Sequence, residues 1–463
     1  MSDVIYNKRE TILNSSLVDD NGSCVIYWMQ RSQRADNNLA LDYAISAANS
    51  LNKPLIVYFG IYDKFPMASV RAFKFMLEGL FETFNTLSDM GIGVALRREN
   101  PWEGIVSLAK KLKAALVVVD EDYLKVGRSW RRQAAENINC RFIQIDADTV
   151  VPVRNSDKEE WGAYTIRPKI LKVLDSYLIP QNSITPNIKW KSKIDNCLDY
   201  DNKESFINLA YQLDVDQSVS ALDNFIGGYS EAIKRMEIFI SERLPYYDKR
   251  NEIGINVQSD ISPYLHFGQI SPLKCALMAS DADATKDNID GFLEQLIVRR
   301  ELAINFCFYS DLYDSLAGAP EWAMKTIKEH QYDPREQLYT LDELENAQTH
   351  DDLWNTAQTE LVKYGKMHGY MRMVWAKSIL EWSTSFEEAL QRAIYLNDKY
   401  LLDGRDANGY TNIAWCIYGK HDRPFANRPI FGKIRYMTTS ATKRKTDWIA
   451  YMERVLNSSL DIS

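Results

Sequence analysis

Short apolar runs alternate with amphipathic stretches along the first third of the chain. The apolar runs have the length and continuity of buried parallel strands, whereas residues 34–51 and 67–84 repeat their apolar positions with helical periodicity. This alternation predicts a doubly wound α/β fold, in which right-handed crossovers place helices on both faces of a parallel sheet. The expected strands are residues 24–29, 54–61, 93–97, 115–120 and 142–146.

The pattern changes after residue 180. Residues 181–219 are polar and weakly periodic, as interdomain linkers are, and the remaining chain is helical in pattern with no strand signal. A chain of 463 residues is also too long for one core. We therefore expect an α/β domain over residues 1–180, a linker over 181–219 and an all-helical domain over 220–463.

Composition indicates an intracellular, soluble globular protein. Hydrophobic residues make up 46% and charged residues 25% of the chain, which is ordinary for such proteins. No apolar segment is long enough to span a membrane, and the first ten residues lack a signal-peptide core. The six cysteines form no CxxC pair and are typical of reduced core thiols. With a net charge of −8, binding to nucleic acid would require a local basic surface.

Several common ligand motifs do not occur in the sequence. There is no GxGxxG and no GxxxxGK[ST], so neither a common dinucleotide site nor an ATP site is indicated. The histidines form no HxxxH pair, and we expect no metal site. The polar loop 403–409 resembles a calcium loop only superficially. With Gly409 at the sixth position, Gly404 would be first and Trp415 last, where carboxylates are needed.

The most informative stretch is residues 366–382, which reads as one helix. One of its faces carries a cation and two indoles. This composition is unusual for a purely apolar core, because arginine is rarely buried without a partner. A tryptophan-rich packing face with an extended arginine stays open as the alternative. The residues that share this face at helical spacing are His368, Arg372, Trp375, Ile379 and Trp382.

Spacing along this helix suggests an electron relay. Trp375 and Trp382 are seven residues apart, so roughly 10.5 Å along the helix axis. That is long for a single electron hop but suits a relay with an aromatic group between them. Trp354, on the preceding helix before the break at Gly365, can supply that group.

Taken together, the segments of this chain resemble the class II cyclobutane pyrimidine dimer photolyases of the photolyase/cryptochrome superfamily. Each matching segment is weak alone, but they occur in family order and cover nearly the whole length. The segments are VIYWMQRSQRADNNLAL (25–41), AYTIRPK (163–169), SDISPYLHFGQIS (259–271), RRELAINFCFY (299–309), IYLNDKY (394–400), DGRD (403–406) and FGKIRYM (431–437).

The resemblance implies a light-driven repair enzyme for pyrimidine dimers in DNA. In this family the helical domain binds FAD, whose fully reduced form passes one electron to a flipped-out dimer. The N-terminal domain of the family carries a light-harvesting antenna, often a deazaflavin, so a second chromophore of that type is an expectation here. The implied partner is dimer-containing DNA, with no membrane, and we expect a monomer.

The resemblance also assigns flavin contacts. Arg372 and Asp403 match the ion pair beside the flavin, and Asn397 matches the residue that faces its N5 atom; an amide can both donate and accept there. Asn408 is expected to close the same loop onto the cofactor. Tyr246 and a turn with the pattern of a helix N-cap before Pro263 match the family's adenine and phosphate contacts. The turn consists of Gln258, Ser259, Asp260, Ile261 and Ser262.

The remaining assignments concern electrons and DNA. By resemblance, Trp375 is proximal to the flavin, Trp354 is intermediate and Trp382 is the exposed terminus. On the DNA side, Met373 and Trp415 match the lining of the dimer pocket. Arg250, Arg299 and Arg423 match DNA contacts, and Arg435 matches the residue that fills the gap in the duplex.

Two substitutions depart from the family pattern. Gln295 stands where a glutamate contacts the dimer, and an amide cannot supply an acidic proton. Ile304 stands where the family usually has an aspartate, and residues 425–427 also differ from the usual tryptophan and charged pair. These departures favour a second hypothesis, a cryptochrome-like blue-light photoreceptor or redox flavoprotein with weak or no repair. A (6-4) photoproduct enzyme, which needs an acidic histidine, is a third reading.

Overall fold

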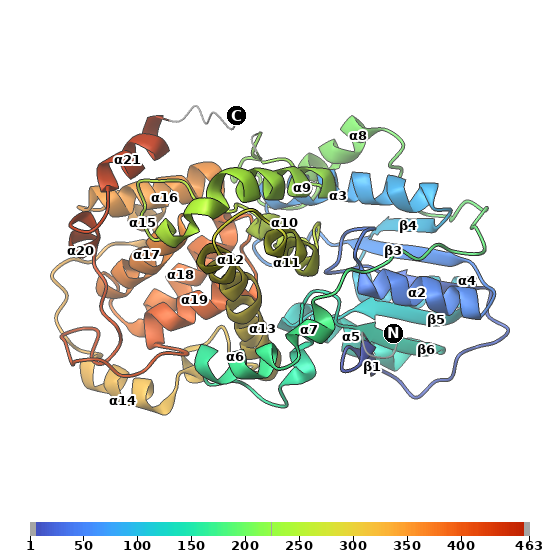
Figure 1. Ribbon diagram of the computed structural model, residues 1–463, viewed down its shortest axis with the longest axis horizontal. Helices are drawn as coiled ribbons and strands as arrows, with labels where there is room; N and C mark the ends of the chain where they lie inside the picture. Colours follow the sequence, from blue (N-terminus) through green and yellow to red (C-terminus); the bar gives the residue numbers. More distant parts are fainter. Residues whose placement is uncertain (1–5, 224, 458–463) are drawn as a thin grey trace.

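The computed structural model describes residues 6–223 and 225–457, and its N-terminal part is built on one six-stranded sheet (Figure 1). The strand order is β1-β6-β5-β2-β3-β4. Neighbouring strands from β6 to β4 are parallel, whereas β1 pairs antiparallel with β6 at the edge. The strands are β1 (Glu10–Ile12), β2 (Cys24–Trp28), β3 (Leu55–Ile61), β4 (Gly93–Arg98), β5 (Ala114–Asp120) and β6 (Arg141–Ile145).

Helices cover both faces of this sheet, which confirms the predicted doubly wound α/β fold. On one face, α2 (Leu39–Ser50) and α3 (Val70–Asp89) share a buried cluster with alternate residues of the strands. On the other face, α4 (Pro101–Leu112) and α5 (Lys125–Asn137) pack on the remaining strand residues. Because both faces are covered, every residue of β2 and β5 is buried, and this explains their uninterrupted apolar sequence.

The predicted linker, residues 181–219, follows the surface of the α/β part. Its backbone donates hydrogen bonds from Trp190 to Gly91 O (2.8 Å) and from Leu198 to Leu96 O (2.8 Å). Its short helix α8 (Lys203–Asn208) places the buried side chain of Phe206 against Phe81 of α3, with ring centroids 6.3 Å apart. This segment therefore packs against the sheet domain along its length.

The rest of the chain is helical, as predicted, and lies to the left of the sheet in Figure 1. Helix α17 lies against α16, α18 and α19 and so occupies the middle of this part. A π-helical turn, Glu294–Arg299, joins α12 to α13. The helices are α6 (Ala163–Leu171) and α7 (Leu174–Tyr177), then α9 (Tyr229–Ile238), α10 (Ser262–His266), α11 (Pro272–Ser280), α12 (Lys286–Leu293), α13 (Arg300–Tyr309), α14 (Glu321–His330), α15 (Leu341–Glu345), α16 (Asp352–Tyr364), α17 (Gly369–Glu381), α18 (Phe386–Tyr400), α19 (Ala407–Tyr418), α20 (Thr439–Lys443) and α21 (Trp448–Asn457).

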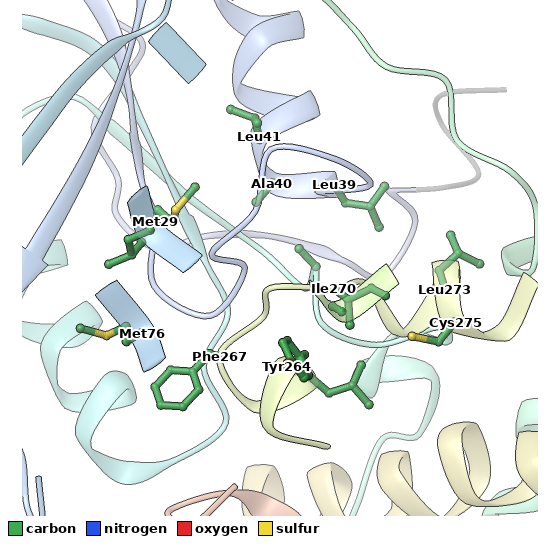
Figure 2. Close-up of a cluster of buried hydrophobic side chains, with 14 of the residues drawn as sticks. Met29, Leu39, Ala40, Leu41, Met76, Tyr264, Phe267, Ile270, Leu273 and Cys275 are labelled. Atoms are coloured by element: carbon green, nitrogen blue, oxygen red, sulfur yellow. The ribbon is translucent and has the colours of Figure 1, made fainter. Parts of the chain in front are cut away.

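An apolar cluster joins the sheet part to the helical part. Figure 2 shows the α/β side chains of Met29, Leu39 and Met76 near Tyr264 and Phe267, which come from α10 and the residue after it. These residues belong to one continuous buried cluster. The two parts therefore share a core.

A buried ionic cluster lies at the same junction. Arg31, which follows β2, pairs with Asp148 and with Asp406, each at 3.2 Å. Arg300 of α13 also pairs with Asp148 (2.8 Å), and His266 lies 3.3 Å from Asp406. Burial acts to raise the pKa of Asp406, but His266, Arg31 and Arg300 outweigh it and hold that pKa well below its ordinary value. Asp406 is thus an anion, and it caps the first turn of α19 by accepting from Asn408 N.

Candidate functional site

A cavity of about 1170 Å³ opens among α10, α13, α16, α17, α19 and the segment after α19. It brings together most of the residues that the sequence analysis selected, although they come from segments far apart in the chain. The selected residues that line it are Arg250, Gln258, Ser259, Asp260, Ile261, Ser262, Gln295, Arg299, Arg372, Met373, Trp375, Asn397, Asp403, Asn408, Trp415 and Arg435. Four others do not line it: Tyr246, Trp354, Trp382 and Arg423.

The ion pair predicted beside the flavin is formed. Arg372 of α17 donates through Nη2 to both carboxylate oxygens of Asp403, at 3.0 Å each. Asp403 is 9% exposed and Arg372 is half-buried, so each charge has a partner inside the cavity wall. The pair places a guanidinium in the cavity wall without leaving an isolated buried charge.

Asn397, near the end of α18, lines the same cavity as this pair. Its Nδ2 donates to Asp398 Oδ1 (2.8 Å), and the same oxygen accepts from Arg405 N, which fixes the amide. Asn397 also packs on Gly409, where a Cβ atom would lie 2.9 Å from Asn397 Nδ2. A larger residue at position 409 would displace the amide, so the glycine of this loop serves the position of Asn397.

The turn 258–262 differs from the predicted phosphate cap. Helix α10 begins at Ser262, but its N-cap residue is Ile261, which offers no side-chain acceptor, and the helix has only five residues. Asp260 instead binds two cations, Arg243 Nη1 (3.0 Å) and Lys366 Nζ (3.1 Å). Burial acts to raise the pKa of Asp260, but Lys366 and Arg243 lower it below its usual value. The sequence analysis did not select Lys366, which lines the cavity.

Tyr246, which the resemblance matches to an adenine contact, lies outside the cavity lining. Its side chain is 55% exposed and does not line the cavity, whereas its neighbour Tyr247 is buried and does. The local backbone leaves helical geometry at Tyr246 (φ −117°, ψ 18°), so the two neighbouring side chains face different ways. The sequence cannot show this kink, because two adjacent tyrosines fit the motif equally well.

His368 also differs from its predicted place within a helix face. It is the N-cap of α17, and its Nδ1 accepts from Tyr370 N (3.2 Å). Its Nε2 lies 3.2 Å from Gln258 Nε2 inside the cavity wall. Burial lowers the pKa of His368 to about 4, and the nearby cations Arg454 and Lys366 act in the same direction. A neutral imidazole at neutral pH does not supply the acid that a (6-4) enzyme needs.

The three predicted relay tryptophans form a continuous row that begins at the cavity. Trp375 lines the cavity and stacks on Trp354 with ring centroids 6.5 Å apart and planes 6° apart. Trp354 in turn contacts Trp382 edge-on at 5.4 Å. Trp354 Nε1 donates to Trp375 O (3.1 Å) and Trp375 Nε1 donates to Gln358 Oε1 (2.8 Å), which hold the rings in place.

The far end of the row is not at the surface, which corrects the expectation of an exposed terminus. Trp382 is only 5% exposed. Tyr339 and His350 cover it, with ring centroids 5.4 Å and 5.3 Å from the indole. Neither residue was selected from the sequence, because both lie before α16 and outside the helix whose spacing was used to select Trp382.

Gln295 lines the cavity from the π-helical turn, and such turns are frequent at functional sites. The preceding Glu294 does not line the cavity. Arg167 binds it through two hydrogen bonds (3.0 and 2.7 Å) and Arg299 through one (2.9 Å). Glu294 therefore cannot replace the carboxylate that is missing at Gln295 without breaking this cluster. Ile304 is 2% exposed in the helical core and does not line the cavity.

Trp415, the predicted stacking residue, is held between two cations. Lys377 of α17 is fully buried, donates through Nζ to Cys416 O (2.6 Å) and lies 5.1 Å from the Trp415 ring. Burial lowers the pKa of Lys377 to about 8. Arg435 lies 5.6 Å from the same ring and 2.9 Å from Asp422.

Arg435 also lies 4.3 Å from the ring of Phe425, one of the residues that depart from the family pattern. Arg423 lies 5.8 Å from the same ring but is exposed and outside the cavity lining. Two of the predicted DNA arginines therefore meet at Phe425: Arg435 lines the cavity and Arg423 does not.

Comparison with known proteins identifies the family of this chain. The DNA photolyase family model matches residues 25–187. A deoxyribodipyrimidine photo-lyase from Methanothermobacter thermautotrophicus is 44% identical over 458 residues, which cover 98% of this chain and 99% of that protein. The chain belongs to the DNA photolyase family. A deoxyribodipyrimidine photo-lyase from Arabidopsis thaliana is 40% identical to this photolyase-family chain over 441 residues, or 93% of this chain and 88% of the relative.

Solved photolyases share the fold at much lower identity. An archaeal photolyase from Sulfolobus tokodaii, described with two FAD molecules, is 16% identical with a TM-score of 0.72, over 95% of this chain and 91% of that one. A class III photolyase from Agrobacterium tumefaciens has a TM-score of 0.70, also at 16% identity, over 94% and 86%. Across residues 6–223 and 225–457, no helix is long and apolar enough to cross a membrane.

Proposed function

We propose that this chain is a deoxyribodipyrimidine photo-lyase of class II type, which uses FAD and light to split cyclobutane pyrimidine dimers in DNA. The observation that carries the proposal is the row of Trp382, Trp354 and Trp375, which ends at the wall of one large cavity. The same cavity holds the Arg372–Asp403 pair and Trp415. The relatives named as deoxyribodipyrimidine photo-lyases, which align along nearly the whole chain, support this assignment.

The residues of the cavity fit a flavin dinucleotide. Its volume of about 1170 Å³ has room for a large cofactor. Lys366, held by Asp260, supplies a cation for a pyrophosphate, and the Arg372 guanidinium can offset negative charge on a reduced ring. When bound, FAD absorbs the light and supplies the electron for repair. Asn397 would stand at the ring edge, where its fixed amide can donate or accept a hydrogen bond.

Four sets of side chains in the cavity account for electron donation, base stacking, DNA binding and stabilisation of the dimer. Trp375 is the residue of the indole row that reaches the cavity, so it would be the electron donor to a flavin bound there. Trp415 offers a fixed ring for stacking against flipped bases. Arg250, Arg299 and Arg435 line the cavity and can bind phosphate oxygens of DNA. Gln295 can stabilise the dimer through a hydrogen bond but cannot transfer an acidic proton to it.

The photoreceptor hypothesis is not favoured, because the long alignments are to repair enzymes. The substitution at Gln295 removes one proton source, and Ile304 lies outside the cavity altogether. A deazaflavin-type antenna in the α/β part stays a prediction, and so do the domain boundaries at residues 180 and 219.

A repair assay tests the proposed function. Protein that carries fully reduced FAD is mixed with an oligonucleotide containing one thymine dimer and exposed to blue light, and the monomers are counted by chromatography. We expect monomers only in the light and only with reduced protein. A Trp415→Ala variant should bind the dimer more weakly, whereas Trp102→Ala, in α4 of the sheet part, should not. Reduced, FAD-loaded protein that neither prefers dimer DNA nor repairs it would overturn the proposal.

A further inference from the structure

Two tryptophans line the cavity, and each would be an electron donor within reach of a flavin bound there. They are Trp375 and Trp415, and they differ in what lies behind them. Trp375 stacks on Trp354, the next member of the row. Among residues 6–223 and 225–457, the ring–ring contacts include none to Trp415. An electron vacancy on Trp375 can therefore move outward, whereas a vacancy on Trp415 has no aromatic neighbour to receive it.

The two indoles also differ in the charges at their rings. Lys377 Nζ lies 5.1 Å and the Arg435 guanidinium 5.6 Å from the centroid of the Trp415 ring. In the part of the chain that the structure describes, the other tryptophan with a cation over its ring is Trp448, which does not line the cavity. Removing an electron from Trp415 would create a positive charge beside two existing ones, and Coulomb repulsion disfavours this.

Lys377 brings more of its charge to this ring than Arg435 does. It is fully buried, and its Nζ donates to Cys416 O (2.6 Å). Among the described residues, no carboxylate oxygen lies within the 4.0 Å of a salt bridge to this Nζ, whereas Arg435 is paired with Asp422 at 2.9 Å. A charge without a close counterion in a low-dielectric interior acts more strongly on its neighbours than a paired one.

Packing alone does not explain a lysine at position 377. Burial of an ammonium group without a paired carboxylate is costly, and methionine fills irregular space in a core with a side chain of comparable flexibility. The hydrogen bond to Cys416 O satisfies a carbonyl near the end of α19. That capping role does not depend on which ring lies next to the ammonium group, so it leaves the contact with Trp415 unexplained.

We propose that Lys377 prevents Trp415 from donating an electron, so that only Trp375 reduces a photoexcited flavin in the cavity. This inference rests on the proposed function, because it requires FAD at this site. The suppressed step is the transfer of one electron from the Trp415 indole to the flavin, which would leave an indole radical cation. Because no aromatic neighbour can refill that vacancy, the electron would return to Trp415 and the energy of the photon would be lost. Lys377 thereby directs photoreduction into the row.

The experiment is time-resolved flavin fluorescence and transient absorption on the oxidised, FAD-loaded protein. Every sample carries Trp375→Phe, which removes the donor of the row at the cavity, and in this background the fluorescence lifetime should be long. Adding Lys377→Met should raise the rate of quenching about tenfold and produce a short-lived tryptophan radical cation. Lys443→Met is the matched control, because it removes a cation 5.0 Å from the ring of Trp448 and should leave the lifetime unchanged.

A third substitution identifies the quencher. Trp415→Phe, added to Trp375→Phe and Lys377→Met, should restore the long lifetime. A lifetime that Lys377→Met leaves unchanged would overturn the inference and reduce Lys377 to a capping residue. A lifetime that stays short after Trp415→Phe would overturn it as well, because the quencher would then be another group.

A change of pH tests the same inference without a substitution at position 377. Burial lowers the pKa of Lys377 to about 8, and the titratable groups that act on it are Cys416, Asp422 and Arg435. Burial raises the pKa of the Cys416 thiol to about 12, so this group stays neutral. In the Trp375→Phe protein, the lifetime should shorten between about pH 7 and about pH 9 as Lys377 loses its proton. Adding Trp415→Phe should abolish that dependence.

A constant lifetime over this pH range would contradict the role of Lys377. The repair assay with dithionite-reduced wild-type protein does not depend on these lifetimes, so its failure would refute the proposed function alone. Protein that takes up no FAD would overturn both.

Discussion

The indole rings of Trp354 and Trp375 stack almost parallel although they belong to successive helices, with 6° between their planes and 6.5 Å between their centroids. The left-handed Gly365 (φ 64°) ends α16 and lets the chain turn back so that α17 runs beside it. The hydrogen bond from Trp354 Nε1 to Trp375 O fixes their register. This stacking shortens the roughly 10.5 Å step between Trp375 and Trp382 into two close contacts.

The relay predicts a graded response to substitution. Trp375→Phe should slow photoreduction of FAD strongly, because it removes the only relay indole at the cavity wall. Trp382→Phe should leave the first quenching of flavin fluorescence by Trp375 intact but impair stable charge separation. The control is Trp130→Phe, whose ring packs on Tyr62 and Phe65 in the α/β part. Equal rates of photoreduction in wild type and Trp375→Phe would remove the relay.

The ion pair predicts a loss of cofactor retention. Asp403→Asn leaves the half-buried Arg372 without its carboxylate, and we expect the protein to lose about 2 kcal/mol of stability and much of its FAD on gel filtration. Asp311→Asn breaks an exposed pair with Arg128 and should change neither quantity measurably. Full FAD content in Asp403→Asn would show that the pair is not part of the cofactor site.

Gln295 predicts a gain of function. Gln295→Glu restores a carboxyl group to the cavity, and we expect a higher yield of dimer repair per absorbed photon because that group can donate a proton. Glu294→Gln, one position away, should not raise the yield, because Glu294 is bound by Arg167 and Arg299 outside the cavity. The measurement is quantum yield on a single-dimer oligonucleotide. No increase in Gln295→Glu would mean that the amide does not limit repair.

The position of Ile304 leads us to expect that Ile304→Asp, which would restore the residue usual in the family, destabilises the protein. Ile304→Asp places a carboxylate at a site that is 2% exposed and surrounded by apolar side chains. We expect a loss of at least about 4 kcal/mol in the free energy of unfolding. Ile304→Val should cost only about 1 kcal/mol. Urea denaturation compares the two, and a stable Asp variant with improved repair would contradict the structure.

Two histidines, the buried His368 and the partly buried His421, lead us to expect a pH dependence of stability. Burial lowers the pKa of His368 and of His421 to about 4, below the value near 6.5 of the unfolded chain. The unfolded state therefore binds protons first as pH falls, so stability is present above about pH 6.5 and is lost between there and pH 4. The loss is on the order of 3 kcal/mol for each histidine. The dependence should weaken in His368→Gln, and constant stability between pH 7 and 5 would refute it.

The sequence predicted most strands because their sheet is covered on both faces, so apolar runs appear without interruption. It missed β1, because three residues at an exposed antiparallel edge carry no such run. The cavity wall was largely predictable because the DGRD loop and α17 are continuous segments. The position of the Tyr246 side chain outside the cavity could not be predicted, because it depends on a local kink of the backbone. The burial of Trp382 could not be predicted either, because it depends on a distant segment that carries Tyr339.

The bond between Arg31 and Asp406 joins residues 375 positions apart. During synthesis, most of the chain has to emerge before Arg31 meets its second carboxylate and the first turn of α19 gains its fixed cap. Contacts of such long sequence separation make folding slow. The ion pair that holds Asp406, at the start of the helix that presents Asn408 and Trp415, can therefore form only after nearly nine-tenths of the chain has been made.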